Sequence, residues 1–207
     1  MDNVTAFARI AESALPLSDK VEMVFDRVGQ DFSKYRTDPF FGMKLLFLYE
    51  DAFQFFANDL EFRTALLHRV AEAHAEAILG GFLEVELRPT AVMLMHEAVS
   101  MWGTLSKHRQ ISVPLDSIVA QVFGEHFDSL CHEVAQCASV VIAAIYENCD
   151  VEGNTPEELR ESHASAIEHI WSFQQDTSWD GPLTRGIQDA ITKFARAAGE
   201  HLGHTPG

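Results

Sequence analysis

Apolar residues recur at helical spacing on both sides of Pro114. Upstream, Leu105, His108 and Ile111 stand three residues apart, so a helix places them on one face. Pro114 disfavours helical geometry at the preceding residue and therefore predicts a sharp break. A second apolar series then predicts one long helix over residues 115–146. This pattern of long helices separated by breaks indicates an all-α fold.

The same spacing predicts further helices, over residues 1–16, 18–32, 39–49, 60–79, 90–108, 155–171 and 183–199. Local signals mark some of their ends. Gly80 and Gly81 are expected to end the helix over 60–79. Thr155 and Pro156, followed by two glutamates, are typical of a helix start, because they combine a capping hydroxyl, a proline and early acidic residues.

Charge and apolar content restrict the partners of the chain. With 207 residues, 47% of them hydrophobic, it is long enough to bury a sizeable core. Its net charge of −16 argues against nucleic acid or an anionic membrane surface as a partner. We find no apolar run of membrane-spanning length and no signal-peptide pattern. Three cysteines without paired metal-ligand spacing favour a reducing, cytoplasmic location.

The stretch Leu105-Ser-Lys-His108-Arg, continued by Val113, resembles the end of the F helix and the FG corner of globins, and is most similar to neuroglobin-like and cytoglobin-like members. The resemblance implies a globin-like helical domain over residues 17–175. Outside it we expect an N-terminal helical extension over 1–16 and a C-terminal helix and tail over 176–207. It also implies that His108 is the proximal ligand of a heme b iron. An imidazole suits this role, because one neutral nitrogen bonds iron while the other N–H is held by a second group.

A second segment, His74 followed four residues later by Ile78, resembles the distal segment of globins. The resemblance implies that His74 is the distal group, which binds the iron directly in neuroglobin-like proteins, and that Ile78 forms an apolar pocket wall. If the register shifts, the distal position falls instead on His68, or on Leu66 or Val70.

Phenylalanines at the corner before residue 60 supply the third point of resemblance. In globins a phenylalanine at this corner packs on the heme plane, a role that suits a flat, rigid ring. We assign this packing on the heme plane to Phe56, with Phe55 as the alternative. The resemblance also implies that Val113 forms a further apolar pocket wall. The implied function is reversible binding of O2, NO or CO. Nitric oxide dioxygenase activity, peroxidase activity and gas sensing stay open, and the terminal helices are expected to support a homodimer.

Two other classes of protein remain alternatives. One is a carboxylate di-iron or heme-oxygenase-like bundle, although the Glu-x-x-His pairs of four-helix di-iron proteins do not occur in the chain. The segment Asn58–Leu67 resembles the ligand domain of tetracycline-repressor-like regulators, although DNA-binding helices are absent. This second resemblance implies a heme-free interaction or regulatory module.

Overall fold

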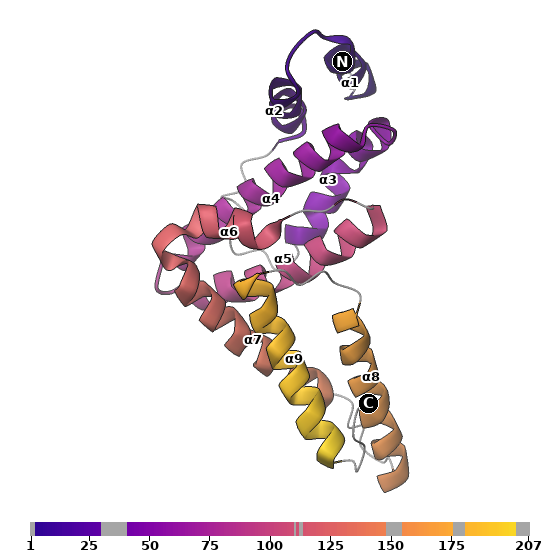
Figure 1. The fold of residues 1–207 in the computed structure, drawn as a ribbon, viewed down its shortest axis with the longest axis vertical. Helices are drawn as coiled ribbons and strands as arrows, with labels where there is room; N and C mark the ends of the chain where they lie inside the picture. Colours follow the sequence, from indigo (N-terminus) through magenta and orange to yellow (C-terminus); the bar gives the residue numbers. More distant parts are fainter. Residues whose placement is uncertain are drawn as a thin grey trace. The chain divides into compact units, whose positions relative to one another are not determined.

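The computed structural model describes residues 3–29, 41–109, 111, 114–147, 155–175 and 181–201, and every regular element in these ranges is a helix (Figure 1). The predicted all-α fold is confirmed. The chain divides into two compact units, Met1–Gly124 and Glu125–Gly207. The boundaries expected after residues 16 and 175 stay predictions. Within the described ranges, no helix combines the length and apolar character needed to cross a bilayer.

The first unit is built around one central helix. Its elements are α1 (Asn3–Glu12), α2 (Leu17–Val28), α3 (Phe41–Phe55), α4 (Leu60–Phe82), α5 (Arg88–Arg109) and α6 (Leu115–Phe123). Helices α2, α5 and α6 all pack against α4, which is therefore the core of this unit. The apolar residues that predicted α4 are buried in it: Phe62, Leu66, Leu67, Val70, Ala73, Ala77 and Ile78.

Two helices end at positions that differ from those expected, and glycines are involved in both. Helix α4 continues past Gly80 and Gly81 and is capped one residue after Phe82, where the Leu83 N–H donates to the carbonyl of Leu79 at 3.0 Å. The expected single helix over 115–146 is instead two helices. Gly124 interrupts it with φ +51°, a conformation that glycine adopts without steric penalty.

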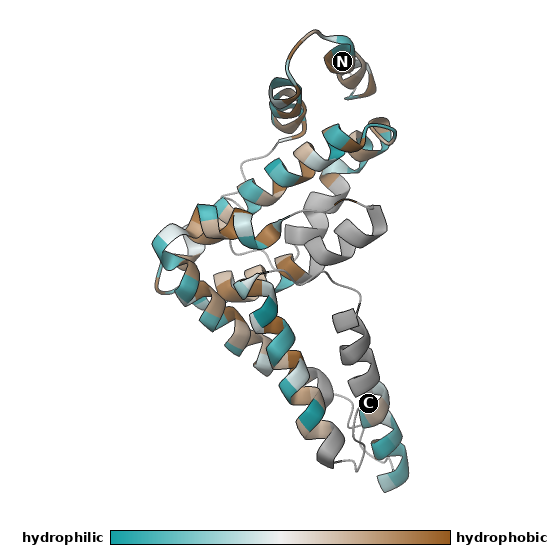
Figure 2. Ribbon diagram, in the orientation of Figure 1, coloured by the Kyte–Doolittle hydropathy of each residue, from teal (hydrophilic) through white to brown (hydrophobic). Residues whose placement is uncertain are grey.

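The second unit contains the short 3₁₀ helix η2 (Gly124–His126) at its start, followed by α7 (Phe127–Glu147), α8 (Pro156–Gln175) and α9 (Pro182–His201). Helix α9 packs against both α7 and α8. Figure 2 shows hydrophobic and hydrophilic residues alternating along it. Its buried residues lie on one helix face, singly or in adjacent pairs three or four positions apart: Leu183, Thr184, Ile187, Ala190, Ile191, Ala195 and Ala198. A Cβ atom at Gly186 of α9 would meet Cβ of Ala135 of α7 at 3.3 Å, so α7 and α9 cross closely there.

The predicted start of α8 is confirmed. The helix begins at Pro156, directly after Thr155. The Glu158 N–H donates to Thr155 Oγ1 at 3.3 Å, and the Thr155 N–H donates to Glu158 Oε2 at 2.7 Å. This is the reciprocal capping box that the local sequence indicated. The backbone hydrogen bond from Thr155 lowers the pKa of the Glu158 carboxyl.

Candidate functional site

The corner between α3 and α4 is a tightly hydrogen-bonded turn. The Phe56 N–H donates to the carbonyl of Ala52 at 3.0 Å, and the Asp59 N–H donates to the carbonyl of Phe56 at 2.9 Å. The Asp59 carboxylate then caps α4, because its Oδ1 accepts the Phe62 N–H at 2.9 Å. The backbone of this corner is therefore held in one conformation before any ligand binds.

A cavity of about 410 Å³ lies between this corner and the link from α1 to α2. The cavity is reached from solvent, since Phe55 is 37% exposed and Leu15 is 43% exposed. Apolar side chains form most of its lining, with one amide and two charged groups: Ala11, Leu15, Leu17, Lys20, Phe55, Phe56, Asn58, Asp59 and Phe62. We refer to it as the corner cavity. Its volume lies within the range of roughly 300–1,000 Å³ that is usual for small-molecule sites.

Packed aromatic rings form the wall of the corner cavity. The rings of Phe56 and Phe62 are stacked with centroids 3.8 Å apart, and Phe55 meets Phe56 edge to face at 4.9 Å. Phe7 of α1 is fully buried and packs against the cluster, with its centroid 5.8 Å from that of Phe55. Because each ring is held by a neighbour, the wall is apolar and needs little reorganisation to receive a ligand.

Two charged side chains line the same cavity. Lys20 donates from Nζ to the carbonyl of Ala11 at 2.9 Å, near the C-terminal end of α1. A cation is favoured there, because the last carbonyls of a helix carry partial negative charge. Asp59 is the negative group, and its N-cap hydrogen bond uses only part of its acceptor capacity. The cavity thus offers an aromatic wall with one cation and one anion.

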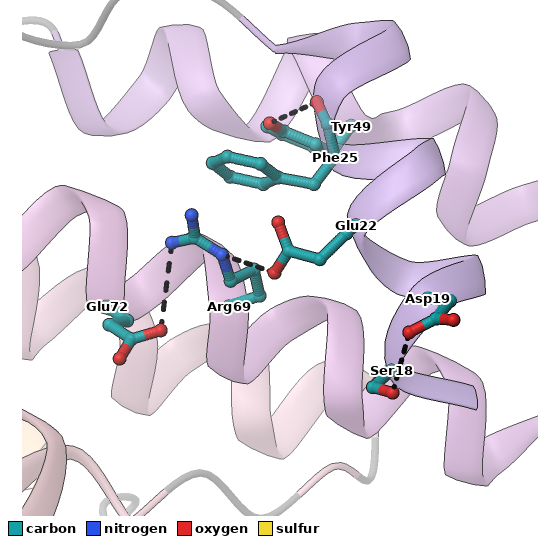
Figure 3. A network of polar contacts seen from close by, with 7 residues as sticks. All are labelled: Ser18, Asp19, Glu22, Phe25, Tyr49, Arg69 and Glu72. Carbon is teal, nitrogen blue, oxygen red and sulfur yellow. Dashed lines mark hydrogen bonds and ion pairs between the residues drawn. The ribbon is translucent and has the colours of Figure 1, made fainter. Parts of the chain in front are cut away.

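A cluster around Arg69 attaches α2 to α4 and so holds one side of the cavity in place (Figure 3). Arg69 donates from Nε to Glu22 Oε1 at 2.7 Å, and its guanidinium carbon lies 4.2 Å from the ring centroid of Phe25. The Phe25 ring stacks in turn on Tyr49 of α3 at 6.0 Å. Burial raises the pKa of the Tyr49 phenol, so that the group stays protonated. Glu72 completes the cluster at 3.7 Å from Arg69 Nη1.

The structure separates the predicted heme contacts. Phe56 is buried and lines the corner cavity together with its alternative, Phe55. His74 and Ile78 are buried on α4, but neither lines this cavity. The alternative distal residue His68 is exposed. Leu66 and Val70 are buried.

His74 is a neutral core histidine. It is 2% exposed, and burial lowers its pKa from 6.5 to about 3, because an imidazolium ion loses its hydration there. Burial also lowers the pKa of His96 on α5. These two histidines each lie eleven residues from Val85, the middle of the turn that joins α4 to α5. In an antiparallel helix pair they therefore stand at the same level.

The globin resemblance pairs His74 with His108, which lies farther along α5 than His96. His108 lies twelve residues beyond His96, which is about 18 Å along a helix axis. Two imidazoles on one metal need nitrogens roughly 4 Å apart, since each metal–nitrogen bond is about 2 Å. This count uses helix positions alone, so the pairing of His74 with His108 at one heme iron stays a prediction. The side chain of His108 and all of Val113 lie outside the described residues, so their roles stay predictions.

Comparison of the chain with protein-family models, with curated proteins and with solved structures found no match. In the part of the chain that the structure describes, no three His, Cys, Asp or Glu side chains come together as a metal-binding group.

Sequence reasoning did not find most residues of the corner cavity. It selected Phe55 and Phe56, but not Leu15, Leu17 or Lys20. No local signal indicates that the link between α1 and α2 lies over a corner formed some forty residues later. Asp59 carried a recognisable signal, as an N-cap residue directly before an apolar helical series.

Proposed function

We propose that the first unit is a heme-free binding module that takes up a small, largely apolar molecule in the corner cavity. The observation that supports this proposal is the cavity itself: about 410 Å³, lined by three packed phenylalanines and open at Phe55 and Leu15. Its two charged groups and one amide would orient a ligand whose body contacts the rings.

The energetics favour binding without a large structural change. Apolar burial contributes about 25 cal/mol per Å², so a ligand that buries roughly 200 Å² against the rings gains on the order of 5 kcal/mol before the entropy of association is subtracted. The net affinity is then expected to be millimolar or weaker. The hydrogen-bonded corner limits the ordering entropy that opposes binding.

The test uses the full chain and the neutral fluorescent probe N-phenyl-1-naphthylamine, whose emission rises in apolar surroundings. Leu15→Trp places a large side chain in the cavity from an exposed position, which leaves the buried core unchanged. Leu83→Trp is the matched control, because Leu83 is 56% exposed and does not line the cavity. We expect saturable binding to the wild type and to the control, and at least tenfold weaker binding to Leu15→Trp. Equal binding to all three proteins would refute the proposal.

A second candidate function keeps the heme b prediction with His108 as sole axial ligand. One observation favours it. Phe56, the expected heme contact, lines the corner cavity, and His108 is as far from the α4–α5 turn as Phe62, which lines it too. In this candidate the helices that pack around α4 would form the globin-like heme-binding domain. When bound, heme would supply an iron for O2, NO or CO, and His74 would have no role as a ligand.

Hemin titration separates the two candidates. The heme candidate predicts a Soret absorption band that saturates at one hemin per chain and is lost or strongly altered in His108→Ala. A Soret band that is the same in His108→Ala and in the exposed-site control His68→Ala would indicate nonspecific adsorption. If hemin is not taken up at all, only the heme-free module remains.

A further inference from the structure

The charges around the corner cavity distinguish between ligands of opposite sign. Asp59 and Lys20 both line it, but they are engaged differently. The Lys20 ammonium is hydrogen-bonded to the end of α1, where helix carbonyls already balance its charge. Asp59 binds a single N–H, and a carboxylate has room for further donors.

The start of α4 also disfavours an anionic ligand. A helix N-terminus usually attracts anions, because its first N–H groups carry partial positive charge. Here that position is taken by Asp59 itself, and Glu61 adds a second negative charge in the first turn. A ligand carboxylate near this corner would therefore meet two carboxylates of the protein.

The aromatic wall and the overall charge act in the opposite direction, in favour of a cation. A phenylalanine ring has a quadrupole that is negative at its face, and an ammonium group is attracted to that face. A net charge of −16 raises the local concentration of small cations around the protein. The apolar lining residues Leu15 and Leu17 would contact a hydrocarbon body but not a charged head.

We propose that the ligand of the corner cavity is an organic ammonium ion with an apolar or aromatic body, its charged head at Asp59 and its body against the phenylalanine wall. This proposal rests on the proposed function, since it names the ligand class of the same cavity. In the bound state Lys20 repels the ligand weakly, and Asp59 attracts it.

The test compares three probes that share one hydrocarbon body: 2-phenylethylamine, 2-phenylethanol and 3-phenylpropionate. Their affinities for the full chain are measured by ligand-observed NMR at low salt, where surface charge effects are least screened. We expect the amine to bind most tightly, the alcohol next and the carboxylate most weakly. A partly exposed charge pair contributes up to about 1 kcal/mol, so each step is about two- to fivefold.

Two charge variants assign the effect to named residues. Asp59→Asn keeps the capping oxygen but removes the charge, so it should weaken amine binding about two- to fivefold and leave alcohol binding unchanged. Lys20→Met keeps the apolar stem and should strengthen amine binding. Asp128→Asn and Lys193→Met, at exposed positions of the second unit, are the matched controls and should change nothing.

The outcomes separate this inference from the proposed function. Tightest binding of the carboxylate, lost in Lys20→Met, would overturn the ammonium assignment while leaving a ligand-binding cavity. Equal binding of all three probes, unaffected by Asp59→Asn, would overturn it as well. If Leu15→Trp binds all three probes and the naphthylamine probe as tightly as the wild type does, the cavity is not a ligand site and both proposals fail.

Discussion

His74 should make the first unit sensitive to acid. Its pKa falls from 6.5 in an unfolded chain to about 3 in the buried site. Between these two pH values His74 is therefore protonated in the unfolded chain and neutral in the native chain. Stability from this group is therefore fully present above pH 6.5 and is lost as the pH falls towards 3. Each pH unit inside that window costs about 1.4 kcal/mol, so the loss is about 2 kcal/mol between pH 7.5 and 5.

The perturbation is His74→Leu, which removes the ionisable group and keeps an apolar side chain in the core. Urea unfolding followed by circular dichroism at pH 7.5, 6.5, 5.5 and 5 gives the free energy of unfolding for each protein. The wild type should lose about 2 kcal/mol more than His74→Leu between the two extremes. His96, whose pKa is also lowered by burial, contributes in the same direction to both proteins and cancels in the difference.

His68→Leu is the matched control, because His68 lies on the same helix but is exposed in the folded chain. It should follow the wild type across the whole pH series. The reasoning is refuted if His74→Leu and the wild type lose the same free energy between pH 7.5 and 5. A difference that appears equally in His68→Leu would also refute it, because burial could then not be the cause.

Three further changes test other parts of the structure by urea unfolding. Arg69→Met should destabilise the chain by about 1–2 kcal/mol, since it removes a partly exposed ion pair and a cation–π contact, whereas Arg196→Met at an exposed position should have little effect. Gly124→Ala should cost about 1–2 kcal/mol, because φ +51° is strained for any residue with a Cβ, and an unchanged midpoint would contradict the observed break. Gly186→Leu should cost about 1–3 kcal/mol or more by forcing α7 and α9 apart, and a variant as stable as wild type would contradict their close crossing.

The local part of the fold was predictable because its signals are local. The 3.6-residue spacing identified α4, and the proline and cap at Pro114 and Thr155 marked real helix starts. The helix end predicted at Gly80 and Gly81 was wrong, because a glycine ends a helix only when its backbone adopts another conformation. Gly124 does so with a positive φ, whereas Gly81 is buried inside α4. Tertiary packing makes that choice, and it is not encoded in the adjacent residues.

The candidate site was only half predictable for a related reason. Phe56 and His74 were selected from the globin resemblance, and both are buried. The pairing of residues across helices depends instead on where the connecting turn lies. The turn at 83–87 is centred eleven residues from both His74 and His96, and the expected gap between the helices over 60–79 and 90–108 gives nearly the same count.

The Arg69 cluster has a consequence for the integrity of the chain. Glu22 and Arg69 are 47 positions apart, so their contact, with the Phe25 ring stacked on Tyr49, fastens both sides of a long loop. If a protease site introduced between α2 and α3 were cut, the contact between Glu22 and Arg69 would still join the two pieces of the polypeptide. The liberated N-terminal peptide should therefore copurify with the remainder and keep covering the phenylalanine wall, until urea or an Arg69 substitution releases it.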